Sequence, residues 1–307
     1  MAHDPFAGLP DKERVPRSAR MLDSWVRDAQ KVVGTRGDRV AWILASTIVM
    51  ASLQRALDND EPLFLLKGGM LIERALNLRS RTTKDVDTLF RGAVDKLEER
   101  IDAALAQPWG ELTLSRAPIE IIENAKRVVK PRRFKVQIDI RGVRWRSIKV
   151  EVAFPEGHVA DDAERLPSLS TQFFGIDTPA ELATISMAYQ VAQKLHACTD
   201  PDDPPAFVND RVRDIADLLL IRDAFYPEGS DLAAVRAACE DIFSARAGEA
   251  AELGLPARGW PPVVVANEVW RQNWAIPAGQ AEIDLRIDEA VDAVNLWIAA
   301  LAAGHDA

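Results

Sequence analysis

Two carboxylates, Asp85 and Asp87, lie two residues apart in the segment 84–90, which reads KDVDTLF. Side chains alternate between the two faces of a strand, so both carboxylates point to one face with Cα atoms ~7 Å apart, while Val86 points into a core. Paired carboxylates of this kind can hold one or two magnesium ions. The same spacing also occurs at a solvated strand edge, so the pair alone is a weak signal.

A lysine and two glycines, Lys67, Gly68 and Gly69, provide a second element between a strand predicted at 62–66 and a helix predicted at 70–78. Glycines at such a turn let the backbone approach a phosphate closely, and the helix N-terminus offers N–H groups to that anion. The interval from Gly69 to Asp85 has room for one helix and a turn. The glycine turn and the carboxylates are therefore expected to meet at one end of a sheet.

The elements that must position these residues form a mixed α/β pattern up to about residue 154. Two helices are expected first, one from a Ser18 cap to a Gly34 stop and one from an Asp38 cap to about residue 57. A charged amphipathic helix is expected at 93–106. Strands are expected at 62–66, 84–90, 112–114 (with 119–122 nearby), 134–140 and 147–154.

The pattern changes in the loop-rich segment 155–178, beyond which we expect almost only helices. These are predicted near 179–198, 209–225, 231–247, 264–274 and 281–302. The predicted fold class is α+β, with an α/β domain that contains a mixed sheet, followed by a helical domain. We predict the domains at 1–165 and 166–307.

The bulk composition describes an ordinary globular chain of 307 residues, with a net charge of −9 and two cysteines. The negative charge argues against a protein that coats nucleic acid with its whole surface. Cys198 and Cys239 have no metal-ligand spacing, and a reducing cytoplasm fits them. The longest uncharged run, 40–54, is shorter than the ~20 apolar residues of a membrane span. We therefore predict a cytoplasmic protein with no membrane partner.

The segment 126–149 reverses the overall charge, with one acid, Asp139, among ten basic residues. Charge runs are usually solvated faces, but this concentration favours a nucleic-acid groove. Trp145 lies among the basic residues and could stack on a base. The RNA-binding candidates are Arg132, Arg133, Arg144 and Arg146.

Four blocks in order resemble the AbiEii/AbiGii toxin family, within the polymerase-β-like nucleotidyltransferase superfamily. Members share K-G-G, R-x-S-x-D-h-D, A-x-K-L-x-A and R-x-K-D-x-x-D-L. Thr83 replaces the serine of the second block, and Arg213 replaces the lysine of the fourth. The matching blocks are Lys67-Gly68-Gly69, Arg81-Thr82-Thr83-Lys84-Asp85-Val86-Asp87, Ala192-Gln193-Lys194-Leu195-His196-Ala197 and Arg211-Val212-Arg213-Asp214-Ile215-Ala216-Asp217-Leu218.

The resemblance implies a polymerase-β-like α/β domain and a magnesium-dependent nucleotidyltransferase toxin of a type IV toxin–antitoxin pair. Mg²⁺, or Mn²⁺, would be held by Asp85 and Asp87. A third carboxylate is usual on a later strand, and Glu151 is slightly favoured over Asp139. The leaving phosphates of an NTP would be held by Lys67, Gly68, Gly69 and Thr83. The acceptor would be an RNA, in some members a tRNA 3′ end, and a separately encoded antitoxin would restrain the enzyme.

The helical half contributes Lys194 and Asp214 as further catalytic candidates. Asp214 and Asp217 share one helix face, and Lys194 could pair with Asp214. The residues alone support a structural ion pair equally well, and the resemblance favours a direct role for Lys194 and Asp214. Two other functions are alternatives. A small-molecule nucleotidyltransferase would not need the basic segment, and a non-catalytic nucleotide- or RNA-binding regulator would not need both Asp85 and Asp87.

Overall fold

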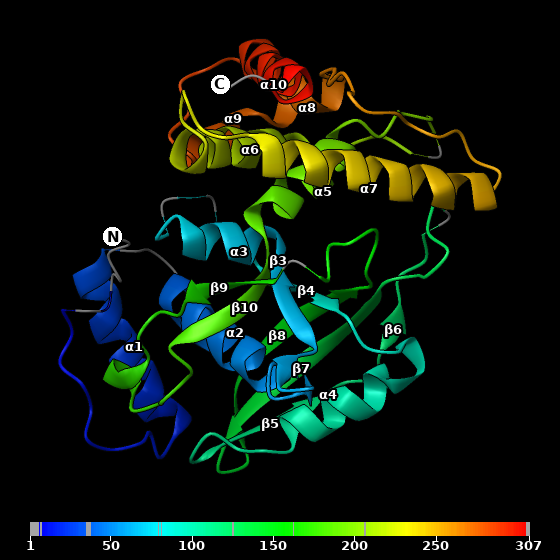
Figure 1. Cartoon of the computed structure of the whole chain (residues 1–307). Coiled ribbons are helices and arrows are strands. Elements are labelled where there is room, and N and C mark those ends of the chain that lie inside the picture. Colours follow the sequence, from blue (N-terminus) through cyan, green and yellow to red (C-terminus); the bar gives the residue numbers. More distant parts are fainter. Residues whose placement is uncertain are drawn as a thin grey trace.

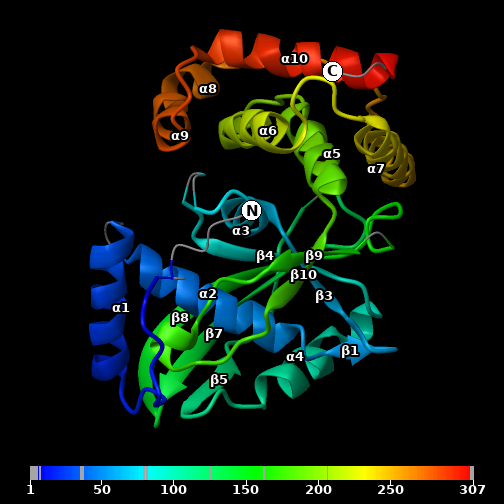
Figure 2. The same ribbon diagram turned by 60° about the vertical axis from the view of Figure 1, so that its left-hand side comes forward.

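The computed structural model describes residues 6, 8–34, 38–78, 80, 82–124, 126–161, 163–205 and 207–304. A sheet with helices packed on it forms one half of the molecule, and a layer of helices forms the other half (Figure 1). The N-terminal helices lie with the sheet, and the C-terminal helix lies on the outside of the helical layer (Figure 2). The expected mixed α+β fold is confirmed.

The main sheet has eight strands in the order β5-β7-β8-β4-β3-β10-β9, with β6 paired to β7. Parallel pairs (β4 with β8, β3 with β10) occur beside antiparallel ones, so the sheet is mixed. A small hairpin of β1 and β2 stands apart from it. The strands are β1 Leu57–Asp58, β2 Glu61–Pro62, β3 Phe64–Lys67, β4 Asp85–Phe90, β5 Leu112–Arg116, β6 Glu120–Ile121, β7 Arg132–Ile140, β8 Val143–Ala153, β9 Ala163–Pro167 and β10 Glu181–Ile185.

Two N-terminal helices, α1 (Ala19–Val33) and α2 (Arg39–Leu53), pack beside the sheet. The hydroxyl of Ser18 accepts a hydrogen bond from the Met21 N–H, and Gly34 ends α1 at φ +70°, which confirms both predicted caps. Asp38 precedes α2 but makes no side-chain cap. Helix α2 ends at Leu53 because the chain turns there to enter β1, earlier than the predicted residue 57.

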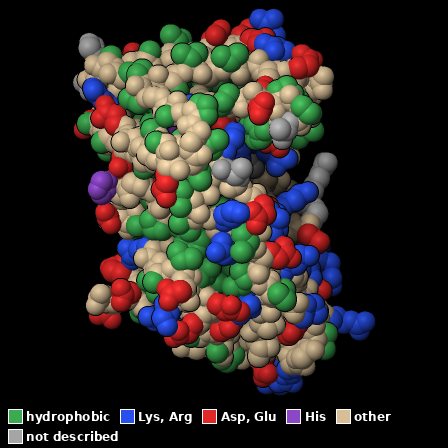
Figure 3. All heavy atoms as spheres, turned by 90° about the vertical axis from the view of Figure 1, so that its right-hand side faces the viewer, with side chains coloured by type: hydrophobic (Ala, Val, Ile, Leu, Met, Phe, Trp, Pro, Cys, Tyr) green, Lys and Arg blue, Asp and Glu red, His purple; other side chains and the backbone are tan. Residues whose placement is uncertain are grey.

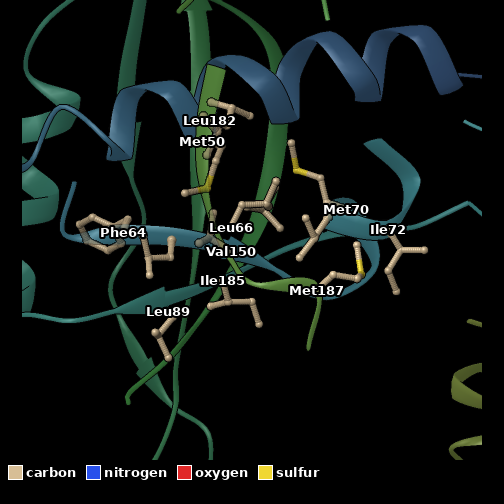
Figure 4. Packing of buried hydrophobic residues seen from close by; sticks show 14 of the residues in the cluster. Met50, Phe64, Leu66, Met70, Ile72, Leu89, Val150, Leu182, Ile185 and Met187 are labelled. Atoms are coloured by element: carbon tan, nitrogen blue, oxygen red, sulfur yellow. The ribbon is translucent and has the colours of Figure 1, made fainter. Parts of the chain in front are cut away.

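The core lies between α2 and the sheet. All but two residues of α2 are buried, and Met50 packs with Leu66 and Val150 among side chains from β3, β8 and β10 (Figure 4). Gln54, just after α2, donates to the carbonyl oxygens of Phe64 and Ala183 and accepts from the Ala183 N–H. This buried amide therefore joins the central strand β3 to β10 and satisfies backbone groups that water cannot reach.

Strand β10 is a correction to the predicted helix 179–198. The segment Glu181–Ile185 is a strand between β3 and β9, and α5 begins only at Met187, after a Ser186 cap. Four of its five residues are buried, and periodicity cannot distinguish a short buried strand from a helical segment. The sheet therefore ends at Ile185 rather than near residue 165, and the division into two domains stays a prediction.

The remaining helices show how the two halves are built. In the sheet half, α3 (Gly68–Ala75) follows β3, and α4 (Leu97–Leu105) packs on β5. In the helical half, α5 packs on α6 and α7, and α10 covers α6 and α7 (Figure 2). None of the described helices is long and apolar enough to cross a membrane. The helices of this half are α5 Met187–Cys198, α6 Val212–Phe225, α7 Ala233–Glu252, α8 Glu268–Asn273, α9 Ala275–Gln280 and α10 Ile287–Ala303.

Candidate active site

Four charged residues form one row across the middle of the sheet. Lys67, the last residue of β3, is the register partner of Asp87 on β4. Asp87 is in turn the partner of Glu151 on β8, which is the partner of Arg133 on β7. Neighbouring strands lie ~4.8 Å apart, and directly paired residues share a face. The row therefore places two carboxylates side by side between a lysine and an arginine.

A second row lies two residues along the same strands and contains the other member of the predicted pair. Asp85 is the register partner of Lys149, which is the partner of Lys135. Between the two rows, Val86 and Val150 are completely buried. The carboxylates therefore lie on the face of the sheet that is turned away from the α2 core, as the alternation in the sequence predicts.

Gly68 brings the glycine turn directly against Asp87. It has φ +69°, and a Cβ added to it would lie 2.2 Å from Asp87 Oδ2. A side chain at position 68 would therefore face both a strained backbone and a clash with a carboxylate. Position 68 therefore requires glycine because of the Asp87 carboxylate, in addition to the predicted close approach of a phosphate to the turn.

The N–H of Gly68 is held by the helical half of the chain. It donates to Oε1 of Gln190 on α5 at 2.8 Å. Because the Gly68 N–H already has an acceptor, it is not free to bind a phosphate. The N–H groups expected to bind phosphate at this turn must belong to other residues, such as Gly69 in the first turn of α3. Gln190 also shows that α5 reaches the glycine turn that follows β3.

Burial and neighbouring charges shift the pKa values of the central pair toward one another. Burial raises the pKa of Asp87 to about 6, the charges of Glu151 and Asp85 add to the rise, and those of Lys67 and Lys194 oppose it. Burial lowers the pKa of Lys67 to about 8, against the charges of Glu156 and Asp87. Two neighbouring, half-buried groups with perturbed pKa values are typical of a functional site.

Lys194 and Asp214 lie together in the helical half, as predicted. Lys194 Nζ on α5 lies 2.5 Å from Asp214 Oδ1 and 2.7 Å from Asp217 Oδ2 on α6. All three side chains are buried. The charge of Lys194 also lowers the pKa of Asp87, although less than the charge of Lys67 does. Asp217 is the more deeply buried of the two acids, which suits a structural partner.

A buried ion cluster around Glu156 was not predicted from the sequence. Glu156 follows β8 and accepts hydrogen bonds from Arg127, from Gln193 on α5 and from Arg246 on α7. Burial by itself would raise the pKa of Glu156, but the charges of Arg246, Arg127 and Lys67 outweigh it and lower that pKa to about 2. The partners lie 29, 37 and 90 positions away, so no local pattern could have indicated them.

The structure separates the two candidates for the third carboxylate. Glu151 lies beside Asp87, as the register shows. Asp139 lies on β7, six residues beyond Arg133 and so ~20 Å along the strand, where it pairs with Arg144 at 2.5 Å. Glu151 is therefore the acid that shares a site with Asp85 and Asp87, and Asp139 belongs to a separate ion pair.

The basic segment is largely neutralised by acids, most of which come from other parts of the chain. Arg133 pairs with Glu151, Arg144 with Asp139 and Arg146 with Asp23. On the face drawn in Figure 3, basic and acidic side chains are interleaved. Of the four RNA-binding candidates, Arg132 alone makes no ion pair with a described residue, and its guanidinium lies over Phe154. Ion pairs are also formed by Lys126, Arg127, Lys130, Arg141 and Lys149.

Trp145 cannot act as a base-stacking platform in this arrangement. Its side chain is only 4% exposed, and its indole N–H donates to Asp23 Oδ1 on α1. Arg146 donates to the same oxygen. The prediction that Trp145 stacks on a nucleobase is therefore wrong, because the sequence does not show that α1 covers this part of β8.

Two further motif residues precede β4. Thr83 is half-buried, and its hydroxyl donates to the carbonyl oxygen of Asp85 at 3.4 Å. This places Thr83 next to the carboxylates, near the position expected for a phosphate contact. Arg81, the first residue of the same block, lies outside the described residues.

The carboxylates fit a magnesium site that the substrate completes. Within the described residues, no three His, Cys, Asp or Glu side chains lie close enough together to form a ready-made metal site. Mg²⁺ is usually bound through one or two carboxylates plus waters and substrate phosphates, rather than by an all-protein cage. Asp87 beside Glu151, with Asp85 in the next row, provides such oxygen ligands.

Known proteins similar to this chain are found among protein families and solved structures. A family model described as the nucleotidyl transferase AbiEii toxin of type IV toxin–antitoxin systems matches residues 51–294. The crystal structure of JHP933 from Helicobacter pylori is 12% identical, with 85% of this chain and 97% of that chain covered and a TM-score of 0.42. The nucleotidyltransferase toxin MenT4 from Mycobacterium tuberculosis is 15% identical, with 94% and 99% covered and a TM-score of 0.46. The search of curated proteins found no match.

Proposed function

Because the chain belongs to the AbiEii family of type IV toxin–antitoxin nucleotidyltransferases, we propose that it transfers nucleotides from an NTP to RNA, with a tRNA 3′ end as the acceptor. Blocking that end would stop translation and growth. The observation that carries the proposal is the row in which Lys67, Asp87 and Glu151 are direct register partners. It places a cation suited to phosphate beside carboxylates suited to a metal ion, on one face of the sheet.

Each residue of the row has a role that follows from its position. Asp85, Asp87 and Glu151 would hold Mg²⁺ or Mn²⁺, which would supply charge neutralisation on the triphosphate and activation of the attacking hydroxyl. Lys67, Gly69 and Thr83 would hold the leaving phosphates, and Gly68 lets the turn approach Asp87. Lys194 and Asp214 would close the cleft from α5 and α6.

Family membership, rather than the basic segment, supports RNA as the acceptor. Most cations of that segment already have acidic partners. The number of basic residues in the sequence is therefore only a weak argument against a small-molecule acceptor. The family is also one of toxin–antitoxin systems, and we propose a separately encoded antitoxin as the protein partner. Growth of cells that express the chain with and without the product of the neighbouring gene tests that partner.

The decisive experiment follows label from each radioactive NTP into total RNA in the presence of Mg²⁺. We expect transfer by the wild type and none by Asp85→Ala or Lys67→Ala. Glu151→Gln should also abolish transfer, whereas Asp139→Asn, a carboxylate-to-amide change in a separate ion pair of the same sheet, should retain it. No transfer to any RNA, with NTP binding intact, would refute the RNA-directed reaction, and label on a small acceptor would favour an antibiotic-type enzyme.

A further inference from the structure

Lys149 occupies the space between two of the carboxylates that the proposed function assigns to the metal. Its Nζ lies 2.8 Å from Asp85 Oδ2 and 3.2 Å from Glu151 Oε1. The position follows from register, since Lys149 is the partner of Asp85 on β4 and lies two residues before Glu151 on β8. An ammonium group thus bridges the two acids from within the sheet itself.

The acids of the site differ in whether a basic side chain of the protein already pairs with them. Glu151 Oε1 accepts from Arg133 at 2.9 to 3.0 Å in addition to Lys149. The side chain of Asp87, in contrast, makes no ion pair with any residue in the described part of the chain, and Lys67 is its nearest source of positive charge in the row. Asp87 is therefore available to a metal ion, whereas Asp85 and Glu151 already have a cation.

We propose that Lys149 is an internal counter-ion that a divalent metal must displace from Asp85 and Glu151, so that this lysine determines how tightly the site binds metal before nucleotide arrives. The inference rests on the proposed function, because it takes these acids as the metal ligands. An ammonium group and a metal ion cannot both lie against the same carboxylate oxygens, since their charges repel and their positions overlap. Lys149 pairs with both Asp85 and Glu151, so it lies between two of the acids that would have to converge on a metal ion.

The chain provides a closely matched control in Lys135. It is the register partner of Lys149 on β7 and therefore lies on the same face of the sheet. It is exposed, and within the described residues it has no acidic partner. Replacing either lysine removes one positive charge from the same part of the same face. Long-range electrostatics change equally, and only Lys149 makes the bridge.

The experiment measures binding of Mn²⁺ to the full chain without nucleotide, by the loss of the free-ion electron paramagnetic resonance signal. We expect Lys149→Met to bind Mn²⁺ at least about tenfold more tightly than the wild type, because a unit charge a few ångströms from the metal is removed. Lys135→Met should stay within about twofold, and Lys149→Arg, which keeps a cation in the bridge, should stay closer to the wild type than Lys149→Met. Thermal unfolding of each variant verifies that it is folded.

Two controls separate the possible failures. If Asp87→Asn binds Mn²⁺ as the wild type does, the proposed metal site is wrong and the inference with it. If binding depends on Asp87 but is unchanged in Lys149→Met, only the role of Lys149 is refuted. A second measurement on the wild type avoids substitution altogether. Mg²⁺ should increase acetylation of Lys149 by an N-hydroxysuccinimide ester relative to Lys135, as followed by mass spectrometry, and an unchanged ratio would contradict displacement.

Discussion

The carboxylate of Asp87 lies where the first side-chain carbon of any other residue at position 68 would have to be. A Cβ built on Gly68 comes within 2.2 Å of Asp87 Oδ2, at a backbone φ of +69°. The glycine turn and the central acid are therefore parts of one site, and neither can be altered without affecting the other.

Gly68→Ala should lower the rate of nucleotide transfer by about 100-fold, because moving a reacting group by ~1 Å has an effect of that size. The matched control is Gly34→Ala at the end of α1, which has φ +70° and nothing within 4 Å of an added Cβ. It should cost about 1 kcal/mol of unfolding free energy from backbone strain and leave transfer intact. Equal activity in the two variants would mean that contact with Asp87 does not matter.

Lys194→Met should reduce the free energy of unfolding by about 3–5 kcal/mol, as expected when one partner of a buried ion pair is removed. It leaves Asp214 and Asp217 buried without the ammonium group that lies 2.5 and 2.7 Å from them. Urea unfolding at neutral pH measures the effect. A change below about 1 kcal/mol, the usual size for an exposed pair, would show that groups other than Lys194 stabilise the buried charges of these two acids.

Asp214→Asn and Asp217→Asn distinguish a direct role from a structural one. If Asp214 contributes to catalysis, its amide variant should lose transfer by at least about tenfold more than its stability loss explains, whereas Asp217→Asn should mainly lower the unfolding temperature. Transfer assays at a temperature where both variants are fully folded make the comparison. Equal retention of activity would assign the whole cluster to stability.

The sequence alone predicts the features of this molecule that depend on neighbouring residues in the chain. Alternation in 84–90 predicted which face Asp85 and Asp87 share, and Ser18 and Gly34 predicted the ends of α1. It was insufficient where distant segments pair. Strand β10 was expected to be helical, because its burial arises from pairing with β3 and β9.

The same limit applies to the site. The ion cluster of Glu156 and the link from Gln190 to Gly68 join residues that no local pattern connects. The sequence also overstates the free positive charge of the basic segment, because acids that neutralise it, such as Asp23 and Glu111, come from other elements.

Glu156 should make the protein sensitive to acid. Its pKa in the folded chain, about 2, lies below the ordinary value of 4.5, so the stabilisation is complete above pH ~5 and is lost as the pH falls from there toward 2. Glu156→Gln should cost about 3 kcal/mol at pH 7, and its difference from the wild type should shrink at lower pH. Glu240→Gln, in a surface pair with Arg236, should cost ~0.5 kcal/mol. A difference for Glu156→Gln that is independent of pH would rule out this ionisation.

Binding of RNA should depend on Arg132 and Lys135, the two cations of the basic segment that have no acidic partner among the described residues. Replacing Arg132 and Lys135 together by Gln should reduce the slope of log affinity against log salt by about 1.4, since each phosphate contact on a single strand contributes ~0.7. Arg144→Gln with Arg146→Gln removes the same charge from residues already paired with Asp139 and Asp23, and should leave the slope nearly unchanged. An unchanged slope in the first pair would remove the segment from RNA binding.

The hydrogen bond from the Gly68 N–H to Gln190 spans 122 positions of the chain. During synthesis, the strands β3, β4 and β8 leave the ribosome before α5 does. The Gly68 N–H therefore has no Gln190 side chain to donate to until α5 has emerged. A chain that ends before Glu181 lacks both β10, the strand beside β3, and α5 with Lys194. Such a chain would carry Asp85, Asp87 and Glu151 without the contacts that the helical half makes to this end of the sheet.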